Sequence, residues 1–460
     1  MKESRVNIVF NQGFIENKKY VVYWMQQSQR VHYNHALLYA IEEANKFQLP
    51  LLVVFVIDPS FPSANARHLT FMLEGIKEIK KELQTRGITF VIKVGKTSPS
   101  ITPLLSDAIS LIMDYGYLSI QKEWREDLLN HVQEHYHINA VIVESDLVVP
   151  YLVTTNKLMY SARTIRPLLH KKYREYLNDY TFIEVQNKTL LRIQNDTDLD
   201  DISAFLKKHQ VDFSVSPSTY YSGGYQEAKK ILQRFILTRL NYYHLSSDPS
   251  VSYTSTLSMY LHFGQISSIE IINTVIDSAA VYGIPQDNID KFIEQLLVRR
   301  ELAYNYISFQ SNYDSFEFCT DSWAYQTMEI HLNDKREYIY QLKDYEHFNT
   351  HDIYFNAAMK EMVYTGFMHN YMRMYWAKKI IEWSPSYIFA YETIKYLNDK
   401  YFIDGRDANS YAGIAWVFGK HDRAWTERPI FGKLRYMNAN GLKRKFEIDA
   451  YVEQCEKYGK

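Results

Sequence analysis

The chain has 460 residues, of which 46% are hydrophobic and 23% are charged, and its formal net charge is −1. This length allows two or three domains with full-sized cores, and the near-zero net charge excludes a protein that coats nucleic acid through charge alone. Two cysteines, Cys319 and Cys455, are too few for a disulfide framework or a thiolate metal site, so we expect no metal and a reducing, cytoplasmic compartment. The start of the chain lacks a signal-peptide pattern, and no apolar run reaches the ~20 residues of a membrane span. We expect a monomer with no membrane partner.

The first 150 residues alternate β-branched apolar runs with amphipathic stretches, which predicts a Rossmann-like α/β domain built on a parallel sheet. The predicted strands cover 20–24, 51–57, 88–94, 109–113 and 140–144. The predicted helices cover about 33–47, 66–86 and 121–136. No GxGxxG turn is present, and the sequence Gly-Lys-Thr at 95–97 lacks the upstream glycine of a phosphate-binding loop, so an ordinary NAD or ATP domain is not expected.

Further along, the periodicity weakens and the sequence FSVSPSTYYSGGY has the composition of an exposed connector. Beyond it, Leu, Ile, Tyr and Trp recur at spacings of three and four, which predicts an all-α domain. We therefore expect an α/β domain over 1–175, a linker over 176–225 and a helical domain over 226–460.

Aromatic residues make up 15% of the chain, with 39 Tyr, 24 Phe and 7 Trp, and they are dense in its second half. A large aromatic core is the commoner explanation of such a composition. A bound planar chromophore or stacked nucleic-acid bases is the alternative.

The stretch 254–264, TSTLSMYLHFG, places four small hydroxyl residues before an apolar helical run. Hydroxyls and free backbone N–H groups at a helix start favour a bound phosphate, because the unpaired donors and the helix dipole both attract an anion. Ser and Thr are also the usual caps of helix N-termini, and capping alone is the commoner explanation.

The stretch EQLLVRRELAYNY at 294–306 places two glutamates and two arginines on one helix. Neighbouring Arg and Glu usually form surface ion pairs. A glutamate that faces a buried cavity would instead act as a hydrogen-bonding group. Glu301 is the better candidate for this role, because Asn305 follows it one turn later on the same helix face.

In GFMHNYMRMYWAKKIIEW at 366–383, Trp376 and Trp383 are seven residues apart and therefore share a helix face. They are either a core pair or steps for an electron moving between a chromophore and the surface.

The stretch 396–425 joins a turn rich in Asp, Gly and Asn to Trp416 and Trp425. Eight Lys or Arg against two acids over 420–445 predict a cationic patch beside these aromatic rings.

These segments together resemble class II cyclobutane pyrimidine dimer photolyases, which belong to the photolyase/cryptochrome superfamily. The likeness covers most of the chain and is carried by ordered motifs, among them YWMQQSQR at 23–30, LSMYLHFGQIS at 257–267, VRRELAYN at 298–305 and FGKLRYMNANGLKRKF at 431–446. It implies an α/β domain that often houses an antenna chromophore such as a deazaflavin, followed by a helical domain that binds FAD. The implied activity is that of a lyase: excited, reduced FAD donates an electron to a pyrimidine dimer flipped out of UV-damaged DNA.

The resemblance also assigns residues to the cofactor. Arg373 and Asp404 are expected to form an ion pair near the isoalloxazine ring. Asn398 is expected to face flavin N5, with Asn409 as the second choice. The other expected cofactor-binding residues are Tyr242, Thr254, Ser255, Thr256, Leu257, Ser258 and Asp407.

For the lesion, the resemblance implies that Glu301 hydrogen-bonds the dimer, that Met374 and Trp416 line an apolar wall, and that Arg435 fills the gap left in the duplex. With Asn398, the first three residues form the expected catalytic set. The other expected DNA-binding residues are Arg423, Trp425, Lys443 and Arg444. The expected electron-transfer residues are Trp376, Trp383 and Tyr340.

One position departs from the family pattern. Phe355 lies in a Phe-Asn-Ala segment where family members typically have Trp-Asn-Ala. Because Phe is far harder to oxidise than Trp, we expect either a relay from Trp376 through Trp383, Tyr354 or Tyr340, or slow photoreduction. Repair itself needs only reduced flavin and is expected to survive.

A cryptochrome-like photoreceptor, which binds FAD and signals without repair, is the alternative function. Glu301, Met374, Trp416 and Arg435 favour the enzyme, because a pure photoreceptor has no need for a lesion pocket or a residue that fills a DNA gap.

Overall fold

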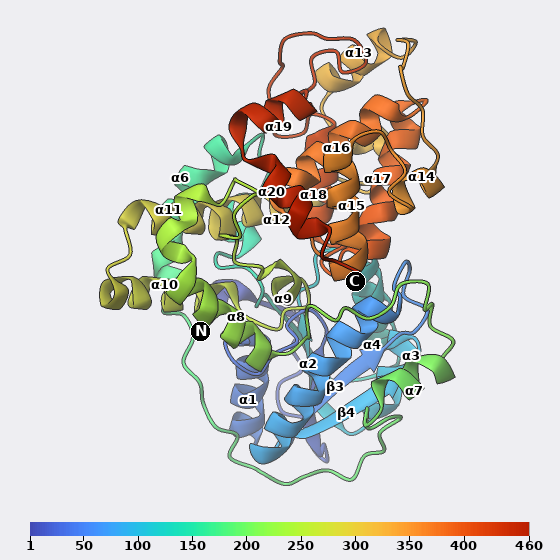
Figure 1. Cartoon of the computed structure of the whole chain (residues 1–460). Helices are drawn as coiled ribbons and strands as arrows, with labels where there is room; N and C mark the ends of the chain where they lie inside the picture. Colours follow the sequence, from blue (N-terminus) through green and yellow to red (C-terminus); the bar gives the residue numbers. More distant parts are fainter. Residues whose placement is uncertain (460) are drawn as a thin grey trace.

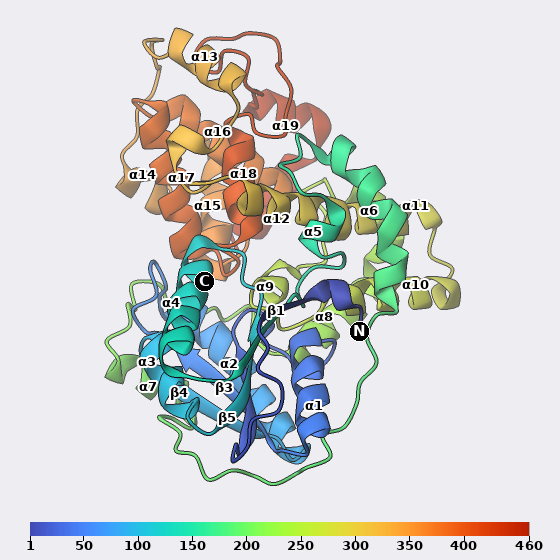
Figure 2. The same cartoon turned by 180° about the vertical axis from the view of Figure 1, so that it is seen from behind.

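The protein, here a computed structural model that describes residues 1–459, consists of a sheet-containing N-terminal part and a helical C-terminal part (Figures 1 and 2). The six-stranded sheet has the order β1-β6-β5-β2-β3-β4, in which only the edge strand β1 runs antiparallel to its neighbour. The strands are β1 (Val6–Phe10), β2 (Tyr20–Met25), β3 (Leu51–Ile57), β4 (Thr89–Val94), β5 (Ala108–Asp114) and β6 (Asn139–Val143). The predicted α/β domain is confirmed, and β1 is a strand that the sequence analysis missed.

Strand β2 is buried on both faces. Val21 and Tyr23 belong to the core beneath α1 and α2, whereas Val22 and Trp24 belong to the core beneath α3 and α4. These helices are α1 (His35–Phe47), α2 (Ala66–Thr85), α3 (Thr97–Ile101) and α4 (Ser119–His135). Helices on both faces explain why the strands are continuous apolar runs instead of alternating patterns.

Part of the linker predicted over 176–225 is hydrogen-bonded to the sheet domain. The backbone N–H of Leu191 donates to the Thr89 hydroxyl at 2.8 Å, and the N–H of Val94 donates to the Asp196 carboxylate at 2.9 Å. The second contact gives a partner to a backbone N–H at the outer edge of β4, which would otherwise lack one. The segment then forms α7 (Ile202–Lys208), which packs on α2, and its long path around the base of the sheet is visible in Figures 1 and 2.

The remaining helices form two aromatic-rich cores, as predicted for an all-α domain. One core contains α6, α8, α10 and α11, and the other contains α12 to α20. Helix α6 thus packs with the helical part although most of it lies before residue 175, where the first domain was predicted to end. The helices are α5 (Tyr151–Thr154), α6 (Ala162–Leu177), α8 (Tyr225–Thr238), α9 (Ser258–His262), α10 (Ser268–Tyr282), α11 (Gln286–Ile293), α12 (Arg300–Phe309), α13 (Ser322–Ile330), α14 (Leu342–Glu346), α15 (Ile353–Thr365), α16 (Asn370–Trp383), α17 (Tyr387–Tyr401), α18 (Ala408–Val417), α19 (Ala439–Lys445) and α20 (Ile448–Cys455).

A fully buried crossover segment, residues 144–149, connects the sheet to the helical part. Three buried arginines donate to its carbonyls: Arg5 to Glu144, Leu147 and Val148, Arg30 to Ser145, and Arg300 to Asp146. Buried backbone carbonyls need such partners because water cannot reach them. The arginines therefore stabilise the connection between the sheet domain and the helical part.

None of the helices within residues 1–459 combines the length and apolar character that crossing a bilayer requires. In the same part of the chain, no cluster of His, Cys, Asp and Glu has the arrangement of a metal site.

Candidate active site

The hydroxyl-rich loop precedes the short helix α9. Thr254, Ser255 and Thr256 are all half-buried, and Thr256 has a left-handed backbone with φ of +55°. Arg239 fixes the loop by donating to the Thr254 carbonyl at 3.1 Å, and the buried Leu257 anchors it in the core. The loop thus presents successive hydroxyls without burying them, whereas Ser258 begins α9 and is exposed.

Tyr242, which was expected near the same loop, lies in the preceding turn. Its ring stacks on Tyr253, directly before the hydroxyl residues, at a centroid distance of 5.2 Å. The structure therefore brings Tyr242 next to the loop entrance.

The expected partners Arg373 and Asp404 form an ion pair. The Arg373 guanidinium on α16 donates to both Asp404 carboxylate oxygens, at 2.9 and 3.1 Å, and lies 3.9 Å from the centre of the Phe402 ring. The Asp404 carbonyl in turn accepts from the Ser410 hydroxyl of α18 at 3.0 Å. The pair therefore ties α16 to the beginning of α18.

One face of α18 borders open space. Asn409, Gly413 and Trp416 follow one another at helical spacings of four and three, so they share this face. Asn409 and Gly413 are exposed, Trp416 is half-buried, and a Cβ on Gly413 would meet no atom within 4 Å. Asn398, on α17, is buried and donates to the Asp399 carboxylate at 2.9 Å.

Asp407, which was expected to bind the cofactor, caps α18. Its carboxylate accepts from the backbone N–H groups of Asn409 and Ser410, at 2.6 and 3.0 Å, and lies 3.7 Å from the His262 ring. Burial alone would raise the pKa of Asp407, but the nearby His262 ring and the hydrogen bond from the Ser410 N–H hold it below its usual value. The cap gives partners to two of the backbone N–H groups at the start of α18, which have none within the helix.

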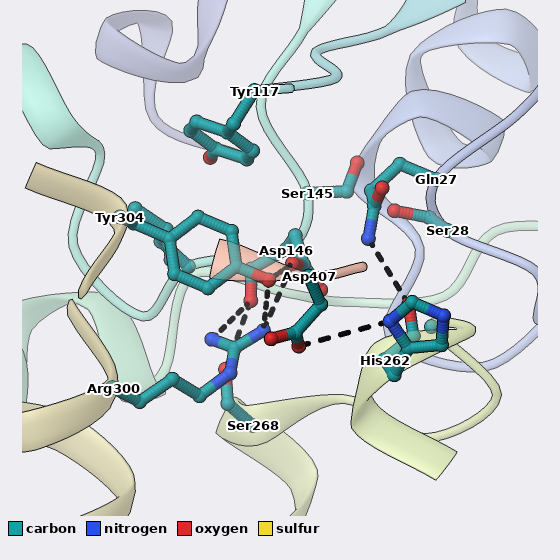
Figure 3. A network of polar contacts seen from close by, with 12 residues as sticks. Gln27, Ser28, Tyr117, Ser145, Asp146, His262, Ser268, Arg300, Tyr304 and Asp407 are labelled. Carbon is teal, nitrogen blue, oxygen red and sulfur yellow. Dashed lines mark hydrogen bonds and ion pairs between the residues drawn. The ribbon is translucent and has the colours of Figure 1, made fainter. Parts of the chain in front are cut away.

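A buried polar network, drawn in Figure 3, joins this region to the sheet domain. The carboxylate of Asp146, in the crossover segment, accepts from Arg300 at 2.8 Å and from the Tyr304 hydroxyl at 2.7 Å. The sequence analysis did not single out Asp146 or His262. The signal available for Asp146 was its place just after β6, since polar side chains at the carboxyl ends of parallel strands face the functional edge of such sheets.

Glu301 and Asn305 share one face of α12, as predicted. Both side chains hydrogen-bond to backbone groups of other segments of the chain. Glu301 is 3% exposed, and its Oε1 accepts from the Val148 backbone N–H at 2.7 Å. Asn305 accepts from the Met159 N–H and donates to the Lys157 carbonyl. Burial raises the pKa of Glu301 to about 8. The other carboxylate oxygen, Oε2, has no hydrogen-bond partner within residues 1–459.

Arg435 is fixed beside two tryptophans. Its guanidinium lies over the rings of Trp416 and Trp425, 4.9 and 4.3 Å from their centres, and makes two contacts with the Asp422 carboxylate. Met374, expected on the same wall as Trp416, is half-buried on α16. The remaining expected DNA-binding cations are exposed: Arg423, Lys443 and Arg444.

A line of aromatic side chains runs from the helical core to the surface. Trp376 is buried and its indole N–H donates to the Met359 sulfur on α15, one turn after Phe355. Phe355 packs on Trp383 at 5.1 Å, and Trp383 packs on Tyr340 at 5.3 Å. Phe355 therefore contacts Trp383 from the same helix, α15, whose Met359 contacts Trp376.

A cavity of about 140 Å³ lies between the two parts of the molecule, at the carboxyl ends of β2 and β3. Its aromatic lining includes Trp24 and Trp124, and its polar lining includes Gln26 and His262. Both amide atoms of Gln26 are buried and have no partner within residues 1–459. Unpaired buried amides are costly, so the Gln26 amide is free to bond a polar group that enters the cavity.

Comparisons with known proteins agree with this arrangement. The DNA photolyase family model matches residues 21–186. The deoxyribodipyrimidine photo-lyase of Methanothermobacter thermautotrophicus is 41% identical over 440 residues, covering 95% of this chain and 94% of the relative. The enzyme of the same name from Potorous tridactylus is 36% identical over 451 residues, covering 97% and 83%.

Two solved structures share the fold at low identity. A class III photolyase from Agrobacterium tumefaciens superposes with a TM-score of 0.73 at 17% identity, covering 95% of this chain and 86% of its own. A cryptochrome from Synechocystis superposes with a TM-score of 0.75 at 15% identity, covering 96% and 89%. Because two curated photo-lyases are more than 30% identical to this chain over nearly its whole length, the chain belongs to the DNA photolyase family and is an enzyme of that family.

Proposed function

We propose that the protein is a class II photolyase that splits cyclobutane pyrimidine dimers in UV-damaged DNA with light and reduced FAD. The observation that carries the proposal is the Arg373–Asp404 ion pair, which is tied through Ser410 to the open face of α18. This ion pair supports the proposal because a bound flavin ring requires a flat, unfilled space, and a fixed pair of charges at its edge can hydrogen-bond to it.

The residues present fit FAD. Bound FAD would supply the light-driven one-electron donor. The hydroxyl loop 254–258 would hold the diphosphate, since its partly exposed hydroxyls can donate to phosphate oxygens. Arg373 and Asp404 would flank the ring, and Asn398 would face N5. The ring would lie over the open face of α18 at Gly413, where an added Cβ would meet no atom within 4 Å.

Glu301 would serve the lesion if its carboxyl is protonated, and its pKa of about 8 supports this state near neutral pH. Oε1 is occupied by the Val148 N–H, which leaves Oε2 to carry the proton and donate it. A donor at this place would stabilise negative charge that develops on the dimer. Met374 and Trp416 would give the flipped dimer an apolar wall.

Arg435 would replace the flipped bases in the duplex, with Trp425, Arg423, Lys443 and Arg444 contacting nearby DNA. A cation that already lies against two aromatic rings can stack on bases and neutralise phosphates. Flipping is cheapest for damaged bases that pair weakly, which favours the lesion over intact DNA.

The interdomain cavity is our candidate site for an antenna chromophore such as a deazaflavin. Aromatic walls and the unpaired Gln26 amide suit a planar heterocycle with a hydrogen-bonding edge. The test is to add the deazaflavin to the purified protein and measure energy transfer to the flavin, with Gln26→Leu as the variant expected to bind it more weakly.

The central test is repair of a duplex oligonucleotide that carries one thymine dimer, using chemically reduced protein under blue light and in darkness. Restoration of the two thymines only in the light supports the proposal. Bound flavin without repair would instead favour the photoreceptor function, and a colourless protein would exclude both.

A further inference from the structure

The C-terminal end of α17 is capped by side chains of the sheet domain. The N–H of Ile403, which would continue the helix by donating to Asp399, donates to the Gly366 carbonyl instead, at 2.9 Å. The carbonyls at this helix end therefore need other partners. Three buried side chains at the start of α2, which we call the α2 clamp, supply them: Asn65 donates to the Lys400 carbonyl at 2.8 Å, Arg67 to Tyr401 at 3.0 Å, and His68 to Phe402 at 3.0 Å.

The direction of each donor in the α2 clamp is fixed within the sheet domain. Asn65 is the N-cap of α2, and its side-chain oxygen accepts from the Arg67 N–H at 3.1 Å, which leaves its NH₂ group to face Lys400. The Asn65 backbone N–H donates to His68 Nδ1 at 3.2 Å. Burial lowers the pKa of His68 well below its usual value, so the ring is neutral and its one proton lies on Nε2, facing Phe402.

Arg67 also binds the end of a second helix. Its guanidinium donates to the carbonyls of Met362 and Val363, in the last turn of α15, at 3.3 and 2.6 Å. Burial lowers the pKa of Arg67 to about 10, so the side chain remains charged at neutral pH. A cation at the C-terminal ends of two helices is stabilised by the negative ends of both helix dipoles.

The two helix ends lead to the two halves of the ion pair at the candidate active site. After α15, the turn at Gly366 leads into α16, which carries Arg373, and after α17, Asp404 follows three residues beyond Tyr401. The two turns are joined by the hydrogen bond from Ile403 to Gly366, and a Cβ on Gly366 would lie only 2.6 Å from the Ile403 side chain. The turns therefore move together, and Arg67 holds both.

We propose that the α2 clamp tunes the electron affinity of the flavin by fixing the Arg373–Asp404 pair at the edge of the ring. The inference rests on the proposed FAD-binding function and goes beyond it, because it gives the sheet domain a part in the redox chemistry of the helical domain. Reduction places negative charge on the ring, and a fixed guanidinium stabilises that charge better than one that can move away. Asn398, in the last turn of α17, is held by the same contacts.

Three substitutions separate this positioning role from simple attachment of the two domains. Asn65→Asp keeps the N-cap of α2, since Asp caps helices as well as Asn does, but it cannot donate to the Lys400 carbonyl. Arg67→Met removes the guanidinium at similar side-chain length. Arg67→Lys keeps the charge but cannot reach all the carbonyls that the planar guanidinium binds.

Asn34→Asp is the matched control. Asn34 is the buried N-cap of α1, and its amide donates to the carbonyls of Ser28 and Arg30, which also belong to the sheet domain. The substitution therefore makes the same chemical change in the same domain but leaves the α2 clamp intact.

The experiment is a spectroelectrochemical titration of the flavin-loaded full chain, with the melting temperature measured in parallel. In Asn65→Asp and Arg67→Met, reduced flavin should lose about tenfold more affinity than oxidised flavin, which lowers the two-electron midpoint potential by about 30 mV. Arg67→Lys should lie between Arg67→Met and wild type. Asn34→Asp should lower the melting temperature but keep the wild-type potential.

A wild-type potential in Asn65→Asp and Arg67→Met would overturn the inference, and so would an equal shift in Asn34→Asp. If Arg67→Met binds too little flavin for titration, Asn65→Asp decides alone, because its α2 cap is intact. These results leave the proposed function untouched, since flavin content and repair by chemically reduced wild type test it separately. A wild type that binds no FAD would overturn both.

Discussion

Arg435 and Asp422 are joined at two points, with Nε 3.0 Å from one carboxylate oxygen and Nη2 3.2 Å from the other. The guanidinium is at the same time held over Trp416 and Trp425. In the DNA-free protein this cation is therefore already fixed in direction, and DNA phosphate would replace Asp422 as its counter-charge.

Arg435→Ala should weaken binding to a duplex that contains a dimer by about tenfold, equivalent to about 1.4 kcal/mol. It should weaken binding to a dimer in single-stranded DNA much less, because no gap needs to be filled there. Titrations of both DNAs at one fixed salt concentration measure the difference.

Arg428→Ala is the charge-matched control for Arg435, since Arg428 is exposed in the same basic segment and lies over Tyr436. It should affect duplex and single strand equally. If Arg435→Ala also weakens binding to the duplex and to the single strand equally, Arg435 does not fill the gap in the duplex.

Glu301 should make the unfolding free energy decrease as pH rises. Its pKa of about 8 in the folded protein exceeds the roughly 4.3 of an unfolded Glu, so the folded state binds more protons between these values. The stabilisation is complete below about pH 4 and is lost as pH rises through about 8. Glu301→Gln keeps an acceptor for the Val148 N–H but cannot ionise. The melting temperature of the wild type relative to this variant should therefore fall between about pH 5.5 and about pH 8.5. A constant difference would mean that Glu301 is ionised throughout.

Glu301→Ala should retain flavin and dimer binding but lose much of the splitting yield per absorbed photon, because no proton donor faces the dimer. It should also cost about 1–3 kcal/mol of stability, since the Val148 N–H is left without a partner. The quantum yield of splitting is measured at saturating DNA. Glu144→Gln is the control: it is another buried carboxyl of the crossover segment, with a pKa raised by burial to about 7, and it should not change the yield. Normal yield in Glu301→Ala would remove Glu301 from the reaction.

Phe355→Trp should accelerate photoreduction of the oxidised flavin severalfold, because an oxidisable ring would lie between Trp376 and Trp383. The site is fully buried, so the larger ring should cost about 1–3 kcal/mol of stability. The rate of flavin bleaching under blue light in the presence of a reductant is the measurement. Phe355→Leu should not accelerate it. No gain in the tryptophan variant would mean that transfer between these two tryptophans does not limit the rate.

The double substitution Thr254→Val with Ser255→Ala should lower FAD affinity by about tenfold or more, at about 1 kcal/mol for each lost hydrogen bond. The flavin-to-protein ratio after dialysis is the readout. Ser250→Ala is the matched control, because the Ser250 hydroxyl donates a hydrogen bond to the Asp248 carboxylate within a nearby turn. This variant should keep its flavin. Full flavin content in the double variant would place the diphosphate elsewhere.

Much of the fold could be predicted because it depends on short-range patterns. The strands β2 to β6 are apolar runs that helices bury on both faces. Their burial could therefore be predicted from the apolar residues in the sequence. The edge strand β1 was missed, since its residues are only partly buried and its pairing with β6 is a contact across more than 130 residues. The contacts of the predicted linker with β4 at Asp196 were not foreseen for a similar reason, because β4 lies about 100 residues earlier in the sequence.

For the site, the sequence determined which chemical groups were available and, through its family resemblance, the pairing of Arg373 with Asp404. Only the tertiary structure decided which partners surround each of these side chains. It directs Glu301 to the Val148 N–H, assigns Asp407 to the cap of α18, and joins Tyr340 to His351. Helical and strand periodicity show which side of an element is buried, whereas the partner on that side depends on how distant elements pack. The chemistry of each group was therefore determined locally, but its environment, and with it the pKa of Glu301, was decided by the fold.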